Sequence, residues 1–110
     1  MPHIVLEYSQ NLETQLNVPA VLLALHEMLA VQGIDQHRIK TRGVPLKDVL
    51  VGQKGADGQM MHITLSLLEG RDIETRRKYG QALYDTLKAH APEDCSVTLE
   101  VREMVKETYF

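Results

Sequence analysis

The chain has 110 residues, 44% of them hydrophobic, with a net charge of −3 and no basic run. This length fits one domain, residues 1–110, built around one core. The charge balance argues against nucleic acid as a partner, and no stretch approaches the ~20 apolar residues of a membrane span. The single cysteine, Cys95, permits no internal disulfide and fits a reducing compartment. We therefore expect a soluble, cytoplasmic protein with no nucleic-acid or membrane partner.

The first half of the chain predicts a strand, a helix and an extended segment. Residues 2–7 form an apolar, β-branched run that is typical of a strand. A helix is expected over about 18–32, with Asn17 as its N-cap and Gly33 as its stop. Its apolar residues follow helical spacing: Val18, Val21, Leu22, Leu25, Met28 and Leu29. Residues 38–51 look extended.

The second half begins with three glycines in the seven residues 52–58, which we interpret as a hairpin loop. Residues 60–68 alternate apolar and polar side chains and predict a strand. A second helix follows its cap, Asp72, and ends before Ala91-Pro92. Residues 96–104 predict the last strand. The inner stripe of the second helix is expected at Ile73, Gly80, Leu83, Tyr84 and Leu87.

The two halves, about 2–51 and 60–104, repeat one order of elements. The opening strands match in sequence, because Pro2-His3-Ile4-Val5-Leu6 aligns with Met61-His62-Ile63-Thr64-Leu65, 59 residues further on. Each half is expected to form a βαβ unit. The prediction is a two-layer α+β fold, in which tandem βαβ units form a four-stranded mixed sheet with both helices on one face.

The uncovered face of this sheet is expected to be mixed in character. Val5 and Glu7 from the first strand would share it with His62, Thr64 and Ser66 from the third. Such a face is too polar for a core and too large to leave exposed, which favours burial against another subunit.

The start of the chain raises a chemical question, because Pro2 directly follows Met1. If Met1 is removed, Pro2 presents a secondary amine whose pKa falls towards neutrality on burial or beside cations. Such an amine suits a general base or acid. A retained Met1 would turn the same nitrogen into an amide without a basic lone pair. Glu7 is the alternative base, and the simplest alternative is a proline with no chemical role.

A metal site is the other possibility that the sequence raises. His3 and His62 occupy matching positions in the two halves, but zinc needs three or four converging ligands and no short spacing supplies them. We interpret both as ordinary strand histidines. The glycine-rich 52–58 stretch lacks the lysine and hydroxyl of a phosphate loop. No metal or cofactor is therefore expected.

Several segments together resemble the 5-carboxymethyl-2-hydroxymuconate isomerase family of the tautomerase superfamily. They are the Pro-His start, Ile39-Lys40-Thr41-Arg42, His62-Ile63-Thr64-Leu65, Gly70-Arg71 and Glu74-Thr75-Arg76. The resemblance covers nearly the whole chain. It implies a tautomerase-like homotrimer in which the N-terminal proline shuttles a proton and arginines grip the carboxylates of a small-molecule substrate.

Carried over by residue, the resemblance makes Pro2 the general base and acid and Arg71 a substrate-binding arginine. Lys40 stands where the family has an arginine, and Arg42 matches a second one. Lysine offers a point charge where guanidinium offers a bidentate fork for a carboxylate. This departure concerns the identity of the substrate more than the proline chemistry.

The predicted function is proton transfer in an unsaturated hydroxy or oxo polycarboxylate. The resemblance implies 5-carboxymethyl-2-hydroxymuconate delta-isomerase activity in homoprotocatechuate degradation, without a cofactor. Two alternatives stay open. One is a tautomerase of a different carboxylated substrate, and the other is a non-catalytic trimeric binding module with the same fold.

Overall fold

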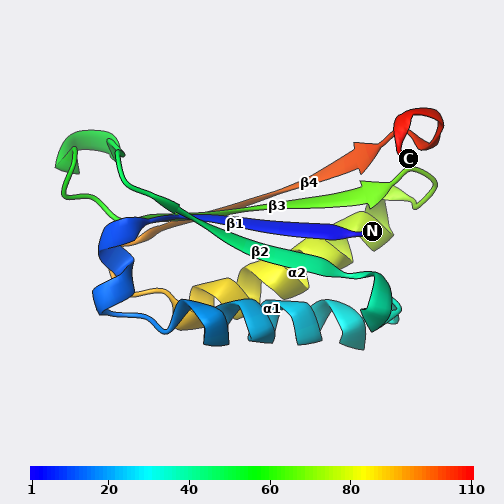
Figure 1. Cartoon of the computed structure of the whole chain (residues 1–110), viewed down its shortest axis with the longest axis horizontal. Helices are drawn as coiled ribbons and strands as arrows, with labels where there is room; N and C mark the ends of the chain where they lie inside the picture. The colour runs from blue at the N-terminus through cyan, green and yellow to red at the C-terminus, as the bar shows by residue number, and fades with distance from the viewer.

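A four-stranded sheet carries two helices on one of its faces (Figure 1). The computed structural model describes residues 1–110. This architecture confirms the predicted two-layer α+β fold. The elements follow in the order β1 (His3–Ser9), α1 (Val18–Val31), β2 (Lys40–Leu46), β3 (Met60–Leu68), α2 (Ile73–His90) and β4 (Ser96–Met104). Short 3-10 turns lie at Gln10–Thr14, Gln36–Arg38, Gly52–Lys54 and Lys106–Thr108.

The strand order β2-β1-β3-β4 places the opening strands of the two halves at the centre of the sheet. β1 runs parallel to β2, and β3 runs parallel to β4. β1 and β3 are antiparallel, with Leu6 opposite Ile63. The start of β1 therefore lies beside the end of β3, and the end of β1 beside the start of β3.

The same order overturns the interpretation of residues 52–58 as a hairpin loop. β2 and β3 are not neighbours, since β1 lies between them. The loop instead carries the chain from one edge strand to a central strand. Glycine and Asp-Gly signals report a local reversal of the chain, and they do not specify which strands pair.

Both predicted helix caps are present. The Asn17 side chain accepts a hydrogen bond from the backbone N–H of Ala20 at 3.2 Å, and that of Asp72 accepts one from Thr75 at 2.8 Å. Gly33 has a φ of +101° just after α1, a conformation that glycine adopts readily.

The core forms between the sheet and the helices. Alternate residues of β1 and β3 are fully buried: Ile4, Leu6, Met61, Ile63, Leu65 and Leu67. The expected inner stripe of α2 is buried at Gly80, Leu83 and Leu87, but Ile73 is 62% exposed and was wrongly included. The buried part of α2 starts at Gly80, and periodicity assigns a residue to a face without saying how far along the helix the core extends. Neither helix has the length and apolarity that crossing a membrane requires.

The other face of the sheet has no helix on it (Figure 1). We call this face the open face. Val5 and Glu7 in β1 lie on it with His62, Thr64 and Ser66 in β3, and all five are half-buried. The mixed character expected for this face is confirmed.

Candidate active site

A cavity of about 560 Å³ lies at the end of the sheet where β1 begins. Met1 and Pro2 form one part of its wall, and Gly33, Ile34, Asp35 and Arg38 from the α1–β2 connection form another. The remaining wall consists of Leu68, Glu69, Arg71, Tyr79 and Lys106. Residues from both halves of the chain therefore meet in one cavity.

The strand directions explain this meeting. Because β1 is antiparallel to β3, the end of β3 reaches Pro2, and because β3 and β4 are parallel, β4 ends at the same place. The backbone N–H of Lys40 donates to the Pro2 carbonyl at 3.0 Å, and that of Glu69 donates to the Met104 carbonyl at 3.0 Å. Pro2 is also buried. Its burial and the hydrogen bond to its carbonyl together fix the position of this residue.

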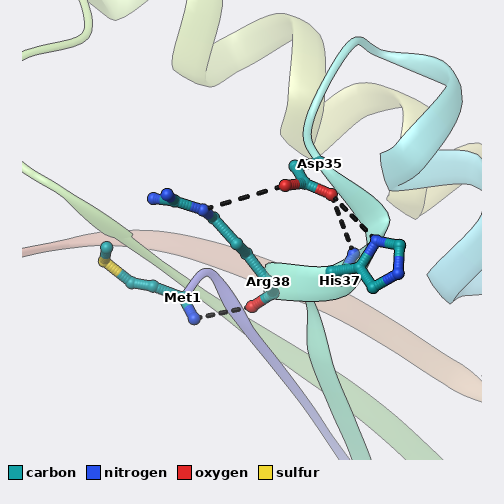
Figure 2. Close-up of polar contacts among 4 residues, drawn as sticks. All are labelled: Met1, Asp35, His37 and Arg38. Atoms are coloured by element: carbon teal, nitrogen blue, oxygen red, sulfur yellow. Dashed lines mark hydrogen bonds and ion pairs between the residues drawn. The ribbon is translucent and has the colours of Figure 1, made fainter.

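Positive charge predominates on the cavity wall. Its cations are the terminal amine, Arg38, Arg71 and Lys106, and its carboxylates are Asp35 and Glu69. Both carboxylates already have partners within the chain. One oxygen of Asp35 accepts from the backbone N–H of His37 at 3.1 Å, and the other lies 3.9 Å from Arg38 Nε (Figure 2). Glu69 Oε2 accepts from the backbone N–H of Lys106 at 2.7 Å.

Arg71 has no carboxylate within ion-pair distance. Its guanidinium donates to the carbonyl of Leu68 at 3.5 Å and lies 5.9 Å from the centre of the Tyr79 ring. Since both contacts are weak, the guanidinium is available to an anionic ligand in the cavity.

The terminal amine lies at the same place. The Met1 nitrogen donates to the carbonyl oxygen of Arg38 at 2.6 Å (Figure 2). Burial lowers the pKa of this amine below its usual value of 8.0, and Lys40 and Arg38 lower the pKa further. A basic nitrogen at this end of β1 is thus shifted towards its neutral form.

Of the four predicted site residues, the structure places two on the cavity wall and two outside it. Pro2 and Arg71 both line the cavity. Lys40 is close enough to lower the pKa of the terminal amine but does not line the cavity. Arg42 lies on the open face, where Nη1 donates to Nδ1 of His3 at 3.0 Å.

His3 joins three segments of the chain. Since Nδ1 accepts from Arg42, Nε2 carries the proton and donates to the hydroxyl of Tyr109 at 2.8 Å. Burial lowers the pKa of His3, and the nearby positive charges of the terminal amine, Arg42 and Lys40 lower it further. His62, at the matching position, has its ring nitrogen 2.7 Å from the hydroxyl of Thr98. No three His, Cys, Asp or Glu side chains are placed to hold a metal ion.

The cavity wall also contains two cations and an aromatic ring that were not predicted from the sequence: Arg38, Lys106 and Tyr79. Arg38 and Lys106 lie in connections outside any amphipathic pattern, and Tyr79 reads as an ordinary helix residue. An assignment of the strand order would have found Arg38 and Lys106, because it brings the segment before β2 and the segment after β4 to the start of β1.

The chain has a tautomerase-like fold, with a proline at the start of a central strand on the wall of a cationic cavity. The model of the 5-carboxymethyl-2-hydroxymuconate isomerase family matches residues 2–109, and the chain belongs to this family. The protein is accordingly an isomerase.

Individual relatives agree with this family. The chain is 29% identical over 93 residues to the Escherichia coli 5-carboxymethyl-2-hydroxymuconate Delta-isomerase, covering 82% of this chain and 72% of that protein. A crystal structure of a 5-carboxymethyl-2-hydroxymuconate isomerase from Deinococcus radiodurans R1 has a TM-score of 0.88 at 23% identity, covering 99% of this chain and 87% of that one. A fused wild-type 4-OT symmetric trimer has a TM-score of 0.74 at 15% identity, covering 96% and 89%.

Proposed function

We propose that the protein is a 5-carboxymethyl-2-hydroxymuconate delta-isomerase acting in aromatic-compound degradation. The observation that carries the proposal is that Pro2 and Arg71 share one cavity with an excess of cations, in a chain of this family. The substrate is a conjugated dienol with several carboxylates, and a cationic cavity suits such a polyanion.

In the proposed reaction, Met1 is removed and the neutral amine of Pro2 accepts the proton of the substrate 2-hydroxyl. The O–H electrons form the C=O bond, the first double bond shifts one position along the chain, and the electrons of the second bond take a proton at the far carbon. The protonated Pro2 supplies that proton. The product is an α,β-unsaturated ketone, no proton is gained or lost overall, and the step needs no metal or organic cofactor.

The surroundings of the terminal amine support this role. The groups that lower the pKa of the Met1 amine, namely Lys40 and Arg38 together with burial, would surround the Pro2 amine once Met1 is gone. Arg71 binds a substrate carboxylate and stabilises negative charge that develops on the oxygen. One set of cations thus serves both binding and activation of the base.

The assembly proposed for this enzyme is a homotrimer. The open face supports it, as do Leu50 and Val44, which are 83% and 39% exposed. Structural relatives of this chain include a symmetric trimer. Sedimentation equilibrium should give about three times 12.5 kDa, and a monomer at micromolar concentration would contradict this assembly. The free thiol of Cys95 supports a cytoplasmic location.

The function is tested by following the loss of the dienol absorbance when purified protein meets 5-carboxymethyl-2-hydroxymuconate. Intact mass is recorded on the same sample, and rapid conversion by protein lacking Met1 is expected. A second candidate, a tautomerase of another carboxylated substrate, is favoured by Lys40 in place of the family arginine. That candidate predicts slow conversion of this substrate and faster conversion of a smaller enol acid such as phenylenolpyruvate. Binding without turnover of either compound would indicate the non-catalytic module.

A further inference from the structure

The segment after β4 contributes Lys106 to the wall of the cavity, although it contains none of the residues to which the proposed mechanism assigns a role. Two contacts hold this segment in place. Its backbone N–H at Lys106 donates to Glu69 Oε2 at 2.7 Å, and the Tyr109 hydroxyl accepts from His3 Nε2 at 2.8 Å. The first contact is to the residue after β3 and the second to the residue after Pro2. The segment is therefore tied on both sides of the cavity.

The Lys106 side chain extends over the turn that precedes Arg71. Its Nζ lies 3.8 Å from the position that a β-carbon on Gly70 would occupy. Gly70 has a φ of +121° and no side chain, so the ammonium lies against bare backbone.

Lys106 also has no internal counterion. No carboxylate oxygen lies within 4.0 Å of its Nζ, and the four ion pairs of the chain involve other cations. The Glu69 carboxylate contacts this residue only through Oε2, which accepts from the Lys106 backbone N–H. Arg38, the other cation on the wall, faces Asp35 instead. Arg71 and Lys106 are thus the two side-chain cations of the cavity without a carboxylate partner.

We propose that Lys106 is a specificity-determining residue that binds a second carboxylate of the substrate while Arg71 binds the first. The inference rests on the proposed function in placing the substrate in this cavity. Selectivity follows from the pair of cations, because a monocarboxylate of the same length uses Arg71 alone and gains nothing from Lys106. A lysine suits this position, since a point charge on a flexible stem tolerates varied carboxylate geometry.

The test compares two unreactive probes that share one diene chain, trans,trans-muconate with two carboxylates and sorbate with one. Dissociation constants are measured by NMR titration for the wild type, Lys106→Gln and Lys106→Arg. Lys88→Gln is the matched control, because Lys88 is exposed in the last turn of α2, away from the cavity. All variants are compared at equal pH and ionic strength.

Lys106→Gln should weaken muconate binding by about fivefold, the effect of a partly exposed charge pair, and leave sorbate binding unchanged. Lys106→Arg should restore muconate binding, and Lys88→Gln should match the wild type for both probes. Equal weakening of both probes, no weakening of muconate, or no muconate binding by the wild type would each overturn the proposal. If muconate binding depends on Lys106 while 5-carboxymethyl-2-hydroxymuconate is not converted, the proposed function fails and the role of Lys106 stands.

Discussion

The two ends of the central β1–β3 pair are built differently. At one end, β1 starts beside the end of β3, and the cavity opens there beside Pro2 and Leu68. At the other end, polar contacts close the structure. Ser9 is only 1% exposed, and its Oγ accepts from the backbone N–H of Met60 at 3.0 Å, while Asn11 donates to the carbonyl of Gly58 at 3.2 Å.

The difference follows from the connectivity of the chain. β3 is preceded by the 52–58 loop, whose last residue, Gly58, accepts from Asn11, and Ser9 accepts from Met60 at the start of β3. At the start of β1, Met1 and Pro2 instead line the cavity. The same pair of strands therefore yields a stabilised junction at one end and a candidate active site at the other.

The largest effect is expected from blocking the Pro2 nitrogen. A chain that keeps a residue in front of Pro2 should lose about 10²- to 10⁴-fold in kcat/KM, the usual contribution of a general base, with an unchanged melting temperature. An amide nitrogen cannot accept the substrate proton. Pro2→Ala with a free amine is the control, and it should keep part of the activity with an altered pH profile. Full activity from protein shown by mass to retain Met1 would point to Glu7 or another side chain.

The second-largest effect is expected from Arg71→Ala. Loss of a charged contact to a carboxylate costs about 2 kcal/mol, or roughly 30-fold in kcat/KM. Stability should change by no more than about 1 kcal/mol, because the guanidinium makes only a long hydrogen bond and a contact with Tyr79. Steady-state kinetics measures the change in kcat/KM, and thermal melting measures the change in stability. Arg77→Ala is the control, because Arg77 is exposed on α2. A collapse in melting temperature with intact kinetics would make Arg71 a structural residue.

Ser9→Ala tests the end of the β1–β3 pair where Ser9 contacts Met60, and it should affect stability alone. The variant leaves the partly buried N–H of Met60 without its side-chain acceptor, which costs about 1 kcal/mol in the free energy of unfolding. Urea denaturation measures the loss, and kcat/KM should stay at the wild-type value. Thr14→Ala is the control, since the Thr14 hydroxyl is exposed. A fall in activity without a fall in stability would contradict the separation of the two ends.

The smallest effect concerns the pH dependence of stability at His3. Because burial and nearby cations lower the pKa of His3 in the folded protein, the unfolded chain binds more protons below its ordinary pKa of about 6.5. The free energy of unfolding should therefore be highest above about pH 6.5 and decline as the pH falls towards the lowered pKa of the folded state.

This prediction is checked by urea denaturation at several pH values. His3→Gln should flatten the decline below about pH 6.5. His62→Gln removes the side chain at the matching position of the other half, and it shows whether the decline belongs to His3 alone. An unchanged decline in His3→Gln would contradict the assignment.

Features that depend on neighbouring residues in the chain were predictable from the sequence. The caps at Asn17 and Asp72 arise within one helical turn, and the alternation over residues 60–68 directly reports which side chains are buried. Both were confirmed. Pairing of strands depends on distant residues, so the 52–58 loop was misread as a hairpin.

The same reason explains what was missed in the candidate site. Pro2 came from the start of the chain and Arg71 from the family resemblance, and both line the cavity. Arg38 and Lys106 reach it only because β2 and β4 lie at opposite edges of the sheet and run parallel to their central neighbours. No local pattern in the sequence reports that arrangement.

Both ends of the chain lie at the cavity end of the sheet (Figure 1), which bears on how the protein is handled in practice. A purification tag fused to the last residue would crowd the segment that contains Lys106, and a tag at the first residue would cover Pro2. The loop at residues 52–58 lies at the opposite end of the molecule (Figure 1). An epitope or immobilisation peptide inserted in that loop would leave the cavity unobstructed.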